Sequence, residues 1–198
     1  SELSALKAQL NPHFLYNVFN TINAAIPSSA KSARDMVNKL SDLFRYQLKA
    51  SREEVVALKE ELDFVEKYLD LEKERFGDRL LFEIDVKQDV LNVEIPPMLI
   101  QPIVENSIKH GISPLIEGGK ISLHISSVEN QLEIVISDTG TGIGNQQKSD
   151  LLKQGVGLSN TNERLQKMYG NEMELMDNTP KGLRVKFTLP INKVSKLL

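Results

Sequence analysis

The hydrophobic period of this chain changes once, near Gly77, and this change constrains the fold more than any other feature. Before Gly77 the apolar residues recur at helical spacing, and after it they recur at every second position. Helices followed by alternating strands are typical of an α+β fold. The sequence therefore predicts a helical domain over residues 1–77 and an α/β-sandwich domain over residues 78–198.

The first domain contains three apolar stripes, over residues 3–22, 36–48 and 58–76. Breaks at residues 27–29 and 52–56 separate the stripes, and the last one ends before a glycine suited to a helix C-cap. Stripes at near-heptad spacing are typical of helices that pack against partner helices. We therefore expect two copies of the chain to form a homodimer through this domain.

The second domain alternates strands with two helical segments. The predicted strands span residues 80–86, 121–125, 132–136 and 185–189, with a shorter one near 173–175. The predicted helices span Pro97 to His110 and Leu158 to Tyr169. This order predicts an antiparallel or mixed sheet covered by helices.

Composition excludes several classes of function. The 198 residues include no cysteine, so thiolate metal sites and cysteine nucleophiles are excluded. The formal net charge of −3 gives no support to a nucleic-acid partner. The chain opens at Ser1 and runs directly into a helical pattern, so we expect a fragment whose membrane segments, if any, lie elsewhere in the parent protein.

Two glycine clusters follow each other in the second domain. The first, Asp138-Thr139-Gly140-Thr141-Gly142-Ile143, directly follows a predicted strand, and the second, Gly155-Val156-Gly157-Leu158, opens a helix. Glycines permit close backbone approach, and a helix N-terminus presents free N–H groups to phosphate. Either cluster alone could be a tight turn, but the two in this order favour a nucleotide site. The polar stretch between them, residues 144–154, could form a lid.

A helix before these clusters carries an acid and an amide, Glu105 and Asn106, followed by Lys109 and His110. The carbonyl of an asparagine is a hard oxygen ligand suited to Mg²⁺. A solvated helix face is the alternative interpretation. His110 could contact phosphate or could interact with the carbonyls at the end of its helix.

These motifs resemble the ATP-binding boxes of the GHKL superfamily, which has the Bergerat fold. The resemblance implies that Asn106 binds Mg²⁺ and that the Asp138 carboxylate accepts a hydrogen bond from the adenine amino group. It also implies that Gly140 and Gly142 line the base pocket and that Gly155 and Gly157 close on the phosphates. Further candidate ATP-binding residues are Lys109, His110, Ile143 and Leu158. Pro102 stands where much of the superfamily has an acid or amide, so a general-base role for Glu105 is left open.

The first stripe places His13 on a polar face shared with Gln9, Asn17 and Asn20. A solvent-facing imidazole is largely neutral at pH 7 and has a lone pair that can attack phosphorus. An ordinary surface histidine is the alternative. Pro12, directly before it, would kink a continuous helix or begin a new helical segment.

Residues 10–17 resemble the phosphoacceptor box of the LytS-like group of sensor histidine kinases. Residues 58–62, 102–106 and 162–165 are also similar to that group. The resemblance implies a two-component kinase that uses ATP and Mg²⁺ to phosphorylate its own His13. The phosphoryl group would then pass to an aspartate of a response regulator receiver domain. It further implies a cytoplasmic domain whose parent is anchored in the bacterial inner membrane.

The sequence supports one further catalytic hypothesis and leaves three alternative functions open. Asn17, one turn beyond His13, is expected to position a water that dephosphorylates the partner regulator. Another GHKL ATPase, of the gyrase, MutL or chaperone type, is the first alternative. A degenerate kinase that acts as a dimeric scaffold is the second, and a nucleic-acid module is a distant third.

Overall fold

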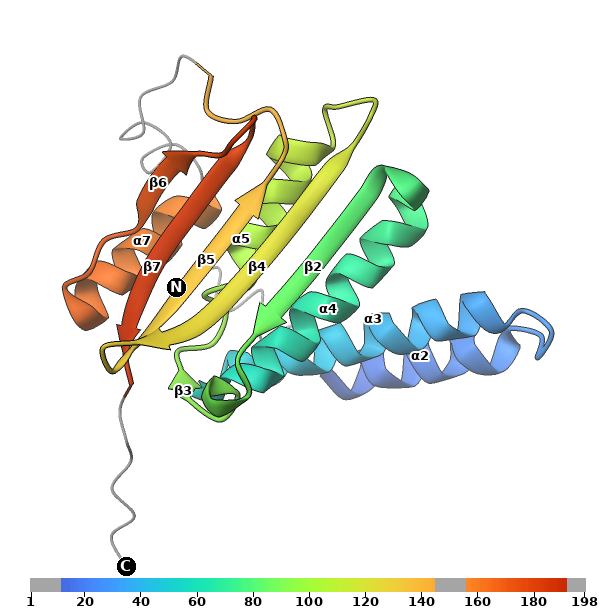
Figure 1. Ribbon diagram of the computed structural model, residues 1–198. Coiled ribbons are helices and arrows are strands. Elements are labelled where there is room, and N and C mark those ends of the chain that lie inside the picture. Colours follow the sequence, from blue (N-terminus) through green and yellow to red (C-terminus); the bar gives the residue numbers. More distant parts are fainter. Residues whose placement is uncertain (1–11, 145–155, 192–198) are drawn as a thin grey trace, which may run out of the picture. The chain divides into compact units, whose positions relative to one another are not determined.

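Figure 1 shows the computed structural model, which describes residues 12–144 and 156–191. Side chains are described over residues 19–144 and 157–191. The chain divides into two compact units, residues 1–53 and 54–198. Each unit is described by itself.

The first unit contains the helices α2 (Pro12–Ala25) and α3 (Lys31–Ala50), joined by a short turn. Phe19 and Phe44 pack edge to face with ring centroids 6.1 Å apart, and the Asn23 side chain donates to Asn38. Apolar side chains also remain exposed on both helices: Ile22, Met36 and Leu40. One copy of the helical hairpin therefore leaves part of its apolar face exposed.

The second unit is built on a five-stranded mixed sheet with the order β2-β4-β5-β7-β6. The strands are β2 (Leu80–Val86), β4 (Gly119–Val128), β5 (Gln131–Asp138), β6 (Glu174–Asp177) and β7 (Leu183–Pro190). β2 runs parallel to β4, and the remaining neighbours are antiparallel. The predicted α+β class, with helices first and an α/β sandwich after them, is confirmed.

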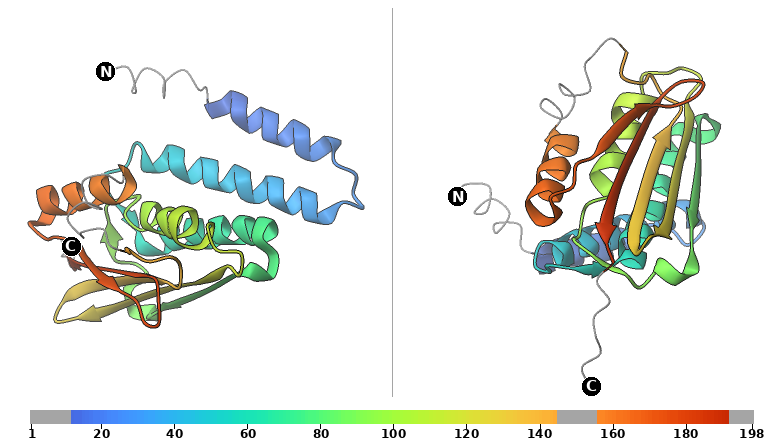
Figure 2. Two further views of the ribbon diagram at one scale, coloured as in Figure 1. Left: turned by 90° about the horizontal axis from the view of Figure 1, so that it is seen from above. Right: turned by 60° about the vertical axis from the view of Figure 1, so that its left-hand side comes forward.

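Helices cover one face of this sheet (Figures 1 and 2). α4 (Leu58–Phe76) lies behind β2, α7 (Val156–Tyr169) lies behind β7, and α5 (Gln101–Asn106) lies between them. α5 continues as a π-helix over Ser107–Ile112. Since α4 packs on the sheet, the compact units separate at Glu53 rather than at Gly77. The functional boundary at residue 77 stays a prediction.

A second sheet joins the start of α4 to the segment before α5. β1 (Val56–Ala57) pairs antiparallel with β3 (Glu94–Ile95), and the Leu58 N–H donates to the Val93 carbonyl at 2.8 Å. Short 3₁₀ turns occupy Gly77–Arg79 and Gln88–Val90. Within the described residues, no helix combines the length and apolarity that crossing a membrane requires.

Candidate functional site

Asp138 is the acidic group at the centre of the site. It ends β5 in the same alternating phase as the buried Ile134 and Ile136, and it is 2% exposed. Its Oδ1 accepts the N–H groups of Gly140 at 2.9 Å and Leu183 at 3.2 Å. Burial raises the pKa of the carboxyl above its ordinary value, and these donors together with the Ser107 hydroxyl oppose the shift. The carboxylate is therefore fixed in place with one oxygen already saturated by backbone donors.

Glycines form the surroundings of this carboxylate. A Cβ on Gly140 would lie 2.4 Å from the Gly111 backbone, and a Cβ on Gly182 would lie 1.9 Å from the Asp138 carbonyl oxygen. A Cβ on Gly111 would lie 3.0 Å from Asp138 Oδ1. The Thr141 N–H and hydroxyl donate to the carbonyls of Gly111 and His110. The result is a close-packed floor in which side chains larger than hydrogen are excluded at several positions.

The helix that carries Asn106 has two distinct flanks. Pro102, one turn before Asn106, faces α7, because a Cβ on Gly157 would lie 3.5 Å from its carbonyl oxygen. Asn106 is half-buried, and its side chain makes no hydrogen bond to any residue within the described ranges. The flank of Pro102 and Asn106 therefore points toward the helix that opens with the second glycine cluster.

Glu105 lies on the other flank, beside α4. Its Oε1 accepts the Gln101 side-chain N–H at 2.7 Å. The pKa of Tyr68 on α4 is raised, first by burial and then by the negative charges of Glu72 and Glu105. The structure thus brings Glu105 together with Gln101 and α4, and it does not place Glu105 on the flank of Pro102 and Asn106.

The other predicted ATP-binding residues divide into three groups. Gly140 belongs to the floor just described, Gly142 lies against the Gly182 backbone, and Gly157 packs against Pro102. Ile143 and Leu158 are buried, at 7% and 2% exposure. The side chains of Lys109 and His110 are exposed on the π-helix. Gly155 lies outside the described residues. His13 and Asn17 lie on α2, in the stretch whose side chains are outside the description.

Ser107, Gly111 and Gly182 also belong to the floor, and the sequence did not predict these three positions. Ser107 stands directly after Asn106, and its neighbours in the sequence gave no indication that its hydroxyl would reach a carboxylate 31 residues away. Gly182 adopts φ +108°, a left-handed value that favours glycine. The isolated glycine at position 182 was the only feature of the sequence that could have indicated its close approach to the Asp138 backbone.

The described residues fit an adenine nucleotide bound with Mg²⁺. Both backbone donors use Asp138 Oδ1, so the other oxygen keeps acceptor capacity for an amino group. The Asn106 carbonyl is available as a hard ligand. Among the described residues, no group of three or more His, Asp or Glu side chains could hold a metal ion by itself.

Two protein families match this chain. Residues 1–80 match the family described as histidine kinase, and residues 96–193 match the family described as histidine kinase-, DNA gyrase B- and HSP90-like ATPase. The second match contains Asn106, Asp138 and every glycine of the two clusters.

Individual proteins that resemble this chain are also named as sensor proteins or histidine kinases. Sensor protein LytS of Oceanobacillus iheyensis is 35% identical, over 100% of this chain and 36% of its own length. Sensor histidine kinase/phosphatase LytS of Staphylococcus aureus is 33% identical, over 98% of this chain and 35% of its own length. The crystal structure of histidine kinase ThkA in complex with response regulator protein TrrA matches with a TM-score of 0.55 and 18% identity, over 96% of this chain and 61% of that one. The chain spans about a third of the length of the LytS relatives.

Proposed function

This chain belongs to the LytS-like sensor histidine kinases, and from that membership we propose that it binds Mg-ATP and phosphorylates its own His13. The observation that carries the proposal is the buried Asp138 carboxylate in its glycine cradle, with Asn106 on the adjoining helix. Asp138 Oδ2, to which neither of the two backbone N–H groups donates, would accept the adenine amino group. Gly155, Gly157 and Leu158 would contact the phosphates, and Asn106 would ligate Mg²⁺.

The transfer needs little covalent chemistry from the protein. A neutral ring nitrogen of His13 would attack the γ-phosphorus and form an N–P bond, while the bond from that phosphorus to the β,γ-bridging oxygen breaks. ADP would leave, and the second ring nitrogen would release its proton to solvent. Mg²⁺, when bound, would neutralise phosphate charge. Because the imidazole attacks in its neutral form, the step does not require Glu105 to remove a proton first.

The proposal extends to partners and location. The exposed apolar residues of the hairpin, Ile22, Met36 and Leu40, support a homodimer formed through α2 and α3. The neighbour crystallised with a response regulator supports a receiver-domain aspartate as the next acceptor. The Staphylococcus aureus relative named kinase/phosphatase supports a phosphatase activity, for which we propose Asn17 as the residue that positions the water. We propose that the chain is a cytoplasmic part of a protein anchored in the bacterial inner membrane.

The test is incubation with Mg-ATP labelled on the γ-phosphate, for the parent and for His13→Gln. Acid-labile label is expected on the parent and absent from the variant. His124→Gln is the matched control, because His124 is an exposed residue on the sheet and its loss should leave labelling intact. Label that persists on His13→Gln would refute His13 as the acceptor. A parent that binds ATP and gains no label would indicate a scaffold.

A further inference from the structure

Residues 96–100 connect β3 to the helix that carries Asn106, and residues 97–100 form a short loop directly before that helix. Met98 in this loop adopts φ +59°, a left-handed conformation that residues with a side chain rarely adopt. Leu99 and Ile100 are 0% exposed. A loop that is buried and held in a left-handed conformation must be fixed by contacts from outside itself.

Glu61 of α4 holds the N–H groups of this loop. Its side chain is 0% exposed, and its Oε1 accepts the N–H groups of Ile100 at 2.6 Å and Gln101 at 3.2 Å. Burial raises the pKa of Glu61, while the N–H groups at residues 98–101 all oppose that shift. The backbone donors at the start of α5 therefore converge on one buried carboxyl group.

Arg164 of α7 holds the carbonyl groups of the same loop. Its Nη1 donates to the Met98 carbonyl at 3.0 Å and its Nη2 donates to the Pro97 carbonyl at 2.8 Å. The planar fork of a guanidinium can bind two neighbouring carbonyls at once, which an ammonium group cannot do with the same geometry. The loop is thus held by an acid from one flanking helix and a base from the other.

The helix that follows depends on this support. α5 has six residues, Pro102 is its second, and the buried Gln101 Oε1 has no hydrogen-bond partner among the described residues. Pro102 is also the residue against which Gly157 packs. Any shift of residues 97–101 would therefore move Asn106 and alter the contact with the start of α7.

We propose that Glu61 and Arg164 are positioning residues of the Mg-ATP site, and this inference rests on the proposed function. Glu61 holds the N–H groups of the loop and Arg164 holds its carbonyl groups, and we call this pair the clamp. The clamp fixes the position of Asn106 relative to the start of α7, so that Mg-ATP could contact both. Asp138 lies at the end of β5, outside this clamp. The clamp should therefore govern the metal-dependent part of nucleotide binding more than the contact with the base.

The experiment measures the dissociation constant of a fluorescent ATP analogue in excess Mg²⁺ and again in EDTA. The ratio of the two constants is the metal increment. Glu61→Gln removes the carboxylate and places an amide N–H group where it faces the backbone N–H donors of the loop. Arg164→Lys keeps the positive charge but cannot donate to both carbonyls with the geometry of a guanidinium. Loss of one hydrogen bond to a charged group changes an equilibrium constant by a factor of about ten or more. Each variant should therefore lower the metal increment about tenfold. The constant in EDTA should change less than about twofold.

The controls are Glu66→Gln on α4 and Lys167→Arg on α7, both at exposed positions. They should keep the parent's metal increment. Because both positioning residues hold one loop, the double variant should lose less than the product of the single losses. A urea midpoint measured for each protein identifies variants that are simply less stable, since such loss would weaken binding equally with and without metal.

The outcomes separate the two proposals. A parent with no nucleotide binding, or with a metal increment of one, would refute the proposed function. A parent with a clear increment that both folded single variants retain would overturn the positioning roles. If Glu61→Gln does not fold, Arg164→Lys decides, because Arg164 is half-buried and keeps its charge in that variant.

Discussion

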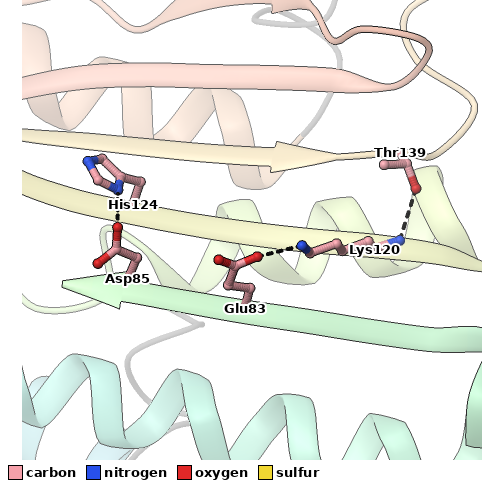
Figure 3. A network of polar contacts seen from close by, with 5 residues as sticks. All are labelled: Glu83, Asp85, Lys120, His124 and Thr139. Carbon is pink, nitrogen blue, oxygen red and sulfur yellow. Dashed lines mark hydrogen bonds and ion pairs between the residues drawn. The ribbon is translucent and has the colours of Figure 1, made fainter.

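The two faces of the five-stranded sheet are built by alternate residues of the same strands, and they differ in what covers them. On the face packed against α4, α5 and α7, Ile134 is 0% exposed and Phe187 is 1% exposed. On the opposite face, polar side chains pair across strands (Figure 3). There Glu83 pairs with Lys120, and Asp85 lies 2.9 Å from His124.

This difference concerns more than burial. Asp138 belongs to the covered phase of β5, and its neighbours Gly111 and Gly182 are packed too closely to accept a methyl group without movement. The pairs on the open face have side chains that are about half exposed, so water and salt screen them. We therefore expect substitutions that add volume on the covered side to alter both stability and nucleotide binding, and those on the open face to alter neither strongly.

The largest effect is expected from Gly182→Ala, which tests the covered side. The new Cβ would lie 1.9 Å from the Asp138 carbonyl oxygen, at a residue with φ +108°. Backbone must move to relieve this contact, so the free energy of unfolding should fall by about 3 kcal/mol or more, and ATP binding should be lost. Urea unfolding followed by circular dichroism, with titration of an ATP analogue, measures both.

Gly170→Ala is the matched control for that substitution. Gly170 also has positive φ, at +67°, but a Cβ there meets nothing within 4 Å. Its cost should be limited to backbone strain of about 1 kcal/mol, with ATP binding unchanged. If Gly182→Ala and Gly170→Ala lose equal stability and both bind ATP, the backbone around Asp138 tolerates a methyl group. The expected difference between the two positions would then be wrong.

The sequence predicts much of this architecture because its signals are local. Period-two alternation located the strands, and glycine placement located the cradle around Asp138. It missed contacts that depend on the tertiary fold: Glu61 is 39 residues from Ile100, and Arg164 is 66 residues from Met98. The predicted helix start at Pro97 differs from the observed start at Gln101, because residues 97–100 form the loop with left-handed Met98. Neither contact has a spacing that sequence periodicity can reveal.

A second prediction concerns Asp138→Asn, which keeps the shape of the covered side and removes its charge. The amide oxygen can still accept the two backbone N–H groups, so stability at pH 7 should be unchanged or slightly higher. An amide nitrogen would replace an acceptor facing the adenine amino group. ATP affinity should therefore fall at least about tenfold.

The same carboxyl group predicts a pH dependence. Burial raises the pKa of Asp138, so the folded protein protonates this group at a higher pH than the unfolded chain does. Its contribution to stability is therefore lost as pH rises from its ordinary pKa through the raised one. Protonation also removes the acceptor, so ATP affinity should fall as pH is lowered through the raised pKa. Asp138→Asn should lack that decline, and a parallel decline in the variant would assign it to another group.

The smallest effect is expected on the open face, at the pair of Glu83 and Lys120. Both side chains are exposed, at 59% and 43%, and exposed ion pairs contribute about 0.2–1 kcal/mol. A double-mutant cycle with Glu83→Gln and Lys120→Met should give a coupling in the free energy of unfolding within that range, and added salt should reduce it. ATP binding should stay within about twofold of the parent, because the Lys120 backbone bonds to Thr139 do not depend on its side chain. A tenfold loss of ATP binding would show that the open face takes part in the site, and the distinction between the two faces would have to be abandoned.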